Sequence, residues 1–204
     1  MNIGEYNRIV TSGTGLYKEK SSKFTAIAFH YKDEKSAKEI LDKLWKENPD
    51  ACHICYAWRF GTNKFKDRFS DDGEPNNSAG KPIFGQIISH ELTNVLVTVV
   101  RIFGGTKLGV GGLMQAYKAA ANQALKNSTI EVDSVCDYYQ LNFDHSRTGQ
   151  VEKILNDVKA VVGERSYSDT FASVTFGVPL YHLDKAMDTL EAAQLNELVF
   201  LRTE

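Results

Sequence analysis

The apolar run at residues 94–103 (NVLVTVVRIF) and the glycine-rich segment directly after it constrain the fold more than any other feature of this chain. A run that is apolar nearly throughout is expected of a strand buried on both faces. Residues 104–112 then hold five glycines and one lysine. A helical pattern follows, with Leu113, Ala116 and Tyr117 on its apolar face. A buried strand is therefore expected to run through a glycine loop into a helix.

The rest of the first 130 residues is also mixed. Residues 24–31 (FTAIAFHY) and 53–60 (HICYAWRF) have the composition of strands, and residues 61–63 suit the turn of a hairpin that begins with the second strand. The apolar residues within 37–45 recur at helical spacing. Pro82 fits the first position of a short apolar helix.

The last third of the chain reads as strand, helix, strand, strand, helix, strand. Its expected strands are 136–143, 163–168, 172–178 and 197–202, and its expected helices carry apolar faces at 151–158 and 183–190. This βαββαβ order predicts a ferredoxin-like plait, an antiparallel sheet with both helices on one side. The expected fold class is α+β with two domains, 1–130 and 131–204.

Charge divides the chain at the same place. Residues 1–130 carry 18 Lys and Arg against 13 Asp and Glu, a balance of +5. Residues 131–204 carry 6 against 13, a balance of −7, which gives the overall −2. An anionic partner is therefore expected at the first domain rather than the second.

Composition excludes several classes of protein. No apolar run approaches the ~20 residues of a membrane span, and the first residues lack the pattern of a signal peptide. Three cysteines are too few, and odd in number, for a secreted disulfide scaffold. We therefore expect a cytoplasmic protein that does not act at a membrane.

The glycine loop is the first candidate for chemistry. Glycine lets a backbone approach a ligand closely, and a helix begins with unpaired N–H groups and a positive dipole end. Together these favour phosphate or another anion, although the spacing matches neither a Walker A motif nor a dinucleotide fingerprint. The open alternative is a turn that needs glycine only for packing. The expected anion-binding residues are Arg101, Gly104, Gly105, Lys107, Gly109, Gly111, Gly112 and Lys81.

The second candidate is an acidic loop at residues 70–82, SDDGEPNNSAGKP. Its three neighbouring carboxylates suit a hard cation such as Mg²⁺, or a general acid or base if crowding shifts one pKa. The alternative is a solvated turn, because the loop consists of ordinary turn residues. No metal ligand or catalytic residue is assigned, and Mg²⁺ stays open as a cofactor. The polar residues of this candidate site are His53, Asp71, Asp72, Glu74 and Ser78.

Two further patterns favour structure over chemistry. Cys52 and Cys55 have C-x-x-C spacing, but no second pair of ligands follows, and alternate strand positions turn their side chains to opposite faces. Aromatic and basic residues interleave over 58–69, which suits either an amphipathic hairpin or a surface for single-stranded nucleic acid. We favour the hairpin.

Several blocks together resemble the IMPACT family in its bacterial, YigZ-type form. The matching blocks are His53–Ala57, Ser70–Pro75, Ala79–Ile83, Val99–Arg101, Phe103–Leu113 and Ala116–Tyr117. The family usually has Ser-Gly-Thr where this chain has Asn76-Asn77-Ser78, so the turn there is expected to differ. The plait at 135–204 is similar to the C-terminal domain of bacterial members. The resemblance therefore covers nearly the whole chain.

The resemblance implies a fold for each domain and a role connected with translation. The first domain would be similar to the second domain of ribosomal protein S-five, and the plait to the last domain of elongation factor G. Eukaryotic members regulate translation through an additional N-terminal domain, so their kinase-pathway role is not carried over. The resemblance supplies no catalytic residues. It does indicate that the two loops face each other and form one polar site.

Two functions remain in view at this stage. The first is a translation-linked regulator, not an enzyme, that binds RNA, the ribosome or translation factors through the basic domain, with a protein partner at the acidic domain. The second is an enzyme or binding protein for a phosphorylated small molecule, with phosphate on the glycine loop and a metal on the acidic loop. No activated nucleophile is recognisable, which favours the first.

Overall fold

A computed structural model describes residues 4–31, 33–62, 64–195 and 197–203 of the chain. The chain divides into two compact units. The N-terminal unit comprises Tyr6–Asp133, and the C-terminal unit comprises Ser134–Glu204 together with the first residues of the chain, including Gly4 and Glu5. The chain therefore passes between the units twice, once at each end of the N-terminal unit. The boundary expected between residues 130 and 131 falls inside a strand, β7 (Thr129–Ser134).

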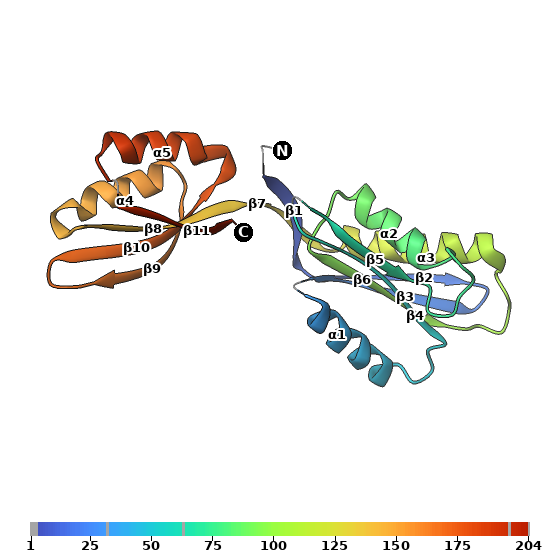
Figure 1. The fold of residues 1–204 in the computed structure, drawn as a ribbon. Helices are drawn as coiled ribbons and strands as arrows, with labels where there is room; N and C mark the ends of the chain where they lie inside the picture. Colours follow the sequence, from blue (N-terminus) through green and yellow to red (C-terminus); the bar gives the residue numbers. More distant parts are fainter. Residues whose placement is uncertain (1–3, 32, 63, 196, 204) are drawn as a thin grey trace. The chain divides into compact units, whose positions relative to one another are not determined.

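The N-terminal unit is built on a five-stranded antiparallel sheet with the strand order β2-β3-β6-β4-β5 (Figure 1). A separate two-stranded sheet pairs β1 with β7. The strands of the unit, besides β7, are β1 (Glu5–Thr11), β2 (Gly13–Glu19), β3 (Ser22–His30), β4 (His53–Phe60), β5 (Lys66–Ser70) and β6 (Val95–Ile102). Its helices are α1 (Glu34–Glu47), α2 (Gly80–Ser89) and α3 (Gly109–Lys126).

The central strand β6 is buried on both faces, as its apolar run predicts. Val95, Val97 and Val99 pack with residues of α2 and α3 in one core. Leu96 and Val100 point to the other face, where they pack in clusters that include buried residues of α1. The sheet thus lies between α1 on one side and α2 with α3 on the other, as Figure 1 shows.

Two glycines bring β2 against α3. A Cβ atom at Gly13 would lie 2.3 Å from the carbonyl oxygen of Ala124, and one at Gly15 would lie 2.4 Å from that of Ala120. Such distances exclude any side chain, so the backbones of the strand and the helix meet directly. The sequence pattern did not predict β1, β2 or β7, because their apolar residues are few and partly exposed.

The C-terminal unit is the predicted ferredoxin-like plait. Its four strands are antiparallel in the order β11-β8-β10-β9, and both helices pack on one core with the sheet. The elements are β8 (Cys136–Asp144), η1 (His145–Arg147), α4 (Thr148–Asp157), β9 (Val161–Tyr167), β10 (Phe171–Pro179), η2 (Leu180–His182), α5 (Leu183–Ala192) and β11 (Leu198–Thr203).

Alternate side chains of β10 form a central part of the core of this unit. Ala172, Val174, Phe176 and Val178 are buried against the helices, while the residues between them face the other side of the sheet. The hairpin of β4 and β5 also forms as expected, although Asn63 of its turn lies outside the described residues. In the described part of the chain, no helix combines the length and apolar character needed to cross a membrane.

Two glycine substitutions should affect stability in opposite directions. Gly15→Ala places a methyl group against the α3 backbone, and overpacking of this kind costs roughly 1–3 kcal/mol or more. Gly85→Ala lies on an exposed position of α2 with no atom within 4 Å of the new Cβ. It should stabilise the protein by about 0.5–1 kcal/mol, because alanine suits a helix interior better. Urea unfolding measures both, and equal midpoints for the two variants would contradict this packing.

Candidate functional site

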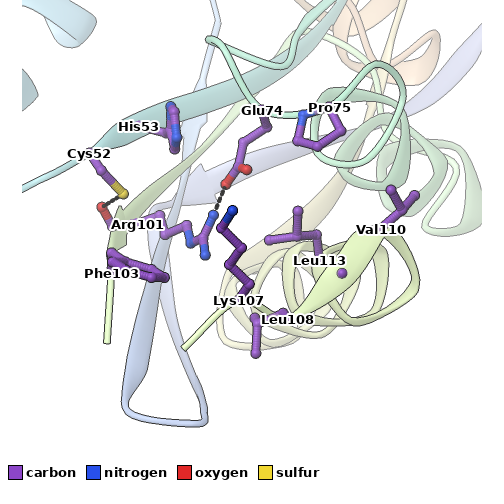
Figure 2. A pocket seen from close by; sticks show the side chains of 11 residues that line it. Cys52, His53, Glu74, Pro75, Arg101, Phe103, Lys107, Leu108, Val110 and Leu113 are labelled. Carbon is purple, nitrogen blue, oxygen red and sulfur yellow. Dashed lines mark hydrogen bonds and ion pairs between the residues drawn. The ribbon is translucent and has the colours of Figure 1, made fainter. Parts of the chain in front are cut away.

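The N-terminal unit contains a cavity of about 510 Å³ where the two candidate loops meet. Figure 2 shows the side chains of Glu74 and Lys107 directed toward the guanidinium group of Arg101. The glycine loop and the acidic loop therefore do face each other. The lining residues are Cys52, His53, Glu74, Pro75, Arg101, Phe103, Lys107, Leu108, Gly109, Val110 and Leu113.

A buried ion pair forms one side of this cavity. Nη1 of Arg101 donates to Oε1 of Glu74 at 2.5 Å, and both side chains are more than nine-tenths buried. The hydroxyl of Tyr117 donates to the same oxygen at 2.7 Å. Buried charges are tolerated only when paired and hydrogen-bonded, so Glu74 needs both donors. One carboxylate thus joins the acidic loop to β6 and α3.

Arg101 has a buried donor that the protein leaves without a partner. Its Nε atom is buried and has no hydrogen-bond partner among the residues that the structure describes. The guanidinium carbon lies 5.4 Å from the ring centroid of Phe24 and 5.5 Å from that of Phe103. A buried N–H without an acceptor is costly, and native proteins rarely leave one. A ligand oxygen in the cavity would supply the missing acceptor.

The start of α3 borders the cavity without a side-chain cap. The N-cap residue, Leu108, makes no side-chain hydrogen bond, and Leu108, Gly109 and Val110 all line the cavity. The first N–H groups of the helix therefore remain available to an anion. Lys107 is exposed, lines the cavity and has no ion-pair partner in the described part of the chain. It adds a mobile positive charge beside the helix start.

The glycines of the glycine loop are required for different structural reasons, some for backbone conformation and one for packing. Gly105 and Gly109 have φ values of 87° and 74°, a left-handed conformation that favours glycine. A Cβ atom at Gly104 would lie 2.1 Å from the carbonyl carbon of Ser21, so that glycine is required by packing. Gly111 and Gly112 belong to the first turns of α3 and do not line the cavity. Packing thus requires glycine at Gly104, whereas backbone conformation favours it at Gly105 and Gly109.

The acidic loop uses its first carboxylate to cap a helix. Oδ1 of Asp71 accepts hydrogen bonds from the backbone of Ala79 at 3.0 Å and of Gly80 at 2.8 Å. Oδ2 accepts from the backbone of Asn77 at 2.8 Å. Asp71 therefore satisfies N–H groups at the start of α2, as an N-cap residue would, from a position eight residues upstream.

The second carboxylate fixes the loop to the sheet. Oδ2 of Asp72 accepts from the backbone N–H of Ile54 at 2.7 Å, and its carbonyl oxygen lies 2.7 Å from Nδ1 of His53. A carbonyl can only accept, so the proton of His53 is on Nδ1. In the neutral ring Nε2 then carries the lone pair. Because His53 pairs with Arg101 across the sheet, both side chains lie on the same face.

The turn that departs from the usual family pattern keeps a glycine-like backbone. Asn77, where the family usually has glycine, has a φ value of 60°. Asparagine adopts this left-handed conformation more readily than most residues. Ser78 is buried, and its hydroxyl donates to the carbonyl of Pro75 at 2.6 Å. Asn77 therefore occupies a backbone conformation that glycine adopts easily.

The two cysteines of the C-x-x-C pattern do not act together. The thiol of Cys52 lies 3.3 Å from the carbonyl oxygen of Arg101, whereas that of Cys55 lies 3.3 Å from the hydroxyl of Tyr117 in the core. Burial raises the pKa of the Cys55 thiol, so it stays protonated and unreactive at neutral pH. Burial also raises the pKa of Tyr117, which therefore remains a neutral donor to Glu74.

The residues expected from sequence do not all reach the cavity. His53, Glu74, Arg101, Lys107 and Gly109 line it. Asp71, Asp72 and Ser78 instead hold the acidic loop in shape, and Lys81 is exposed outside the lining. No group of three or more His, Cys, Asp or Glu side chains suited to a metal occurs within the described ranges. The lining residues that were not expected at the site are Cys52, Pro75, Phe103, Leu108, Val110 and Leu113.

Comparison with protein families places this site in context. The model of the Impact N-terminal domain matches residues 20–125, a segment that contains every residue lining the cavity. The chain belongs to the IMPACT family. The IMPACT family member YigZ of Escherichia coli (strain K12) is 37% identical over 154 residues, which are 70% of this chain and 76% of YigZ.

Two more relatives extend the likeness toward the C-terminal unit. The IMPACT family member YvyE of Bacillus subtilis (strain 168) is 28% identical over 157 residues, 77% of this chain and 72% of YvyE. A crystal structure of a hypothetical protein covers 98% of both chains with 28% identity and a TM-score of 0.70. The likeness to that structure thus includes both units.

Removing the hydroxyl of Tyr117 should destabilise the N-terminal unit. In Tyr117→Phe the ring keeps its edge-on contact with Phe24, but Glu74 and Cys55 each lose a partner. We expect a loss of about 1–3 kcal/mol in the free energy of unfolding, measured with urea. Tyr167→Phe is the matched control. Tyr167 is 64% exposed, so removing its hydroxyl should change the free energy of unfolding by no more than about 0.5 kcal/mol. Equal effects would show that Glu74 does not depend on Tyr117.

The cysteines should differ sharply in reactivity. A thiol reagent at neutral pH should modify exposed Cys52 quickly and leave buried Cys55 untouched until the protein unfolds. Mass spectrometry of peptides from the native protein measures this. Rapid labelling of Cys55 under native conditions would contradict its place in the core.

Proposed function

We propose that this protein is a translation-linked regulator whose N-terminal unit binds RNA by holding phosphate in the cavity between the two loops. The observation that carries the proposal is the buried Nε of Arg101, which lacks an acceptor beside the uncapped start of α3. Phosphate oxygens are strong acceptors and suit both arginine and helix starts. The resemblance to eukaryotic IMPACT members, which regulate translation, supports the cellular setting.

The distribution of charge supports the same proposal. Residues 1–130 carry a charge balance of +5. Two of their positively charged residues, Arg101 and Lys107, line the cavity. A positive region attracts a polyanion and speeds its association. The balance of −7 in residues 131–204 disfavours RNA at the plait. That unit is a better candidate for contact with a basic protein surface, such as one on the ribosome or a translation factor.

A phosphorylated small molecule is the second candidate. The cavity volume of about 510 Å³ falls in the range of small-molecule sites, and five of its lining residues are apolar or aromatic. Those residues are Phe103, Leu108, Val110, Leu113 and Pro75. In this case His53 would offer Nε2 as an acceptor for a ligand hydroxyl. The phosphate would occupy the same place as in the first proposal.

Binding to labelled single-stranded RNA over a range of salt concentrations tests the main proposal. We expect affinity to fall as salt rises, because phosphate contacts release counterions. Lys107→Ala should weaken binding and reduce the salt slope by about one, the contribution of one phosphate contact. Lys107 is exposed, so the variant should fold normally.

The matched control is Lys46→Ala, which removes an exposed lysine from the last turn of α1. This helix packs on the opposite face of the sheet from α3, so binding at the cavity should not change. Equal losses from the two variants would indicate diffuse attraction rather than a site. Affinity that does not respond to salt would contradict the proposal outright.

A further inference from the structure

The cavity has a charged part, formed by Arg101, Glu74 and Lys107 and called its floor below, and an apolar part. Arg101 contributes a buried Nε without an acceptor, next to the open start of α3. Phe103 and Val110, which also line the cavity, are 46% and 52% exposed. The ring of Phe103 lies within 5.5 Å of the guanidinium carbon of Arg101. An anionic group bound at the floor would therefore bring whatever is attached to it against an aromatic ring.

The charge at the floor matches a doubly charged anion. Arg101 and Lys107 contribute two positive charges, Glu74 cancels one, and the start of a helix adds about half a charge. The sum is roughly +1.5. A phosphomonoester carries about −1.5 to −2 at pH 7, whereas an internal phosphodiester of RNA carries only one negative charge. The electrostatic balance thus favours the monoester.

The position of the buried Nε of Arg101 also favours a phosphomonoester over a phosphodiester. Nη1 of Arg101 already binds Glu74 and Nε is buried, so an acceptor that reaches Nε must lie close against this residue of the cavity lining. An internal phosphodiester has sugar attached on both sides and only two free oxygens. A terminal phosphomonoester has three free oxygens and a single attachment, so it can enter end first.

We propose that the cavity binds the terminal phosphomonoester of a nucleotide, with phosphate on Arg101, Lys107 and the start of α3, and the base against Phe103. Exposed aromatic rings are the usual platforms for bases of single strands. The inference rests on the phosphate-binding function proposed above and narrows it from any phosphate to the end of a strand or a free nucleotide.

Three RNAs of identical sequence and one free nucleotide test this inference on the full-length protein. They are a short single-stranded RNA with a 5′-phosphate, the same RNA with a 3′-phosphate, the same RNA with hydroxyl groups at both ends, and a nucleoside monophosphate. Fluorescence anisotropy with competition gives their affinities at one salt concentration. We expect one phosphorylated RNA to bind about tenfold tighter than the hydroxyl form, the effect of one additional charge-assisted hydrogen bond.

Two variants connect the preference to the cavity. Arg101→Lys keeps a charge opposite Glu74 but loses the planar Nε donor, so it should lose most of the preference for a terminal phosphate. Phe103→Ala, at an exposed position, should weaken all nucleotide ligands in parallel. Lys118→Gln, exposed on α3 away from the cavity, is the matched control and should bind as the unaltered protein does. Urea unfolding of Arg101→Lys separates a lost contact from a lost fold.

Each outcome decides a different point. Equal affinity for phosphorylated and hydroxyl RNA would overturn the terminal-phosphate inference while leaving RNA binding in place. Binding of the nucleoside monophosphate without any RNA would support the phosphomonoester site and overturn the RNA function. No binding of any of the four ligands would overturn both. A preference that survives unchanged in Arg101→Lys would place the phosphate elsewhere.

Discussion

The N-terminal unit depends on the buried ion pair between Glu74 and Arg101. Removing two charges from water costs several kcal/mol per ion, and the hydroxyl of Tyr117 offsets part of this cost by donating to the same carboxylate oxygen. These three residues come from a loop, a strand and a helix. The loop must therefore hold a fixed shape, which Asp71 and Asp72 maintain through backbone hydrogen bonds. Stability and the geometry of the cavity thus follow from the same contacts.

Much of the architecture could be predicted because it follows simple periodicities. The run at 94–103 became the central strand, and the alternation at 172–178 became the core strand of the plait. Strand β2 could not be predicted in this way, since its backbone meets that of α3 at Gly13 and Gly15 and the strand has no regular apolar alternation. A glycine that admits a helix backbone looks the same in sequence as a glycine in a turn.

The candidate site was predictable at the level of loops but less so at the level of atoms. The family resemblance indicated that the glycine loop and the acidic loop form a common site, and Glu74, Arg101 and Lys107 do line one cavity. Asp71 and Asp72 carry the same functional groups as Glu74, yet their oxygens accept backbone N–H groups. Which carboxylate stays with the cavity depends on tertiary contacts that spacing does not encode. Phe103 and Val110 gave no signal, because an exposed apolar residue is common on any surface.

The residues Gly4 and Glu5 have a consequence for how the two units are connected. The backbone N–H of Val135 donates to the carbonyl of Gly4 at 2.9 Å, so a segment preceding the N-terminal unit belongs with the plait. Along the chain the N-terminal unit is thereby flanked on both sides by residues of the other unit, and its two ends are neighbours: the Tyr6 hydroxyl lies 3.4 Å from an oxygen of Asp133. Units with adjacent ends can be exchanged or inserted without disturbing their host. The N-terminal unit should therefore tolerate excision or transfer as one piece that carries the cavity with it.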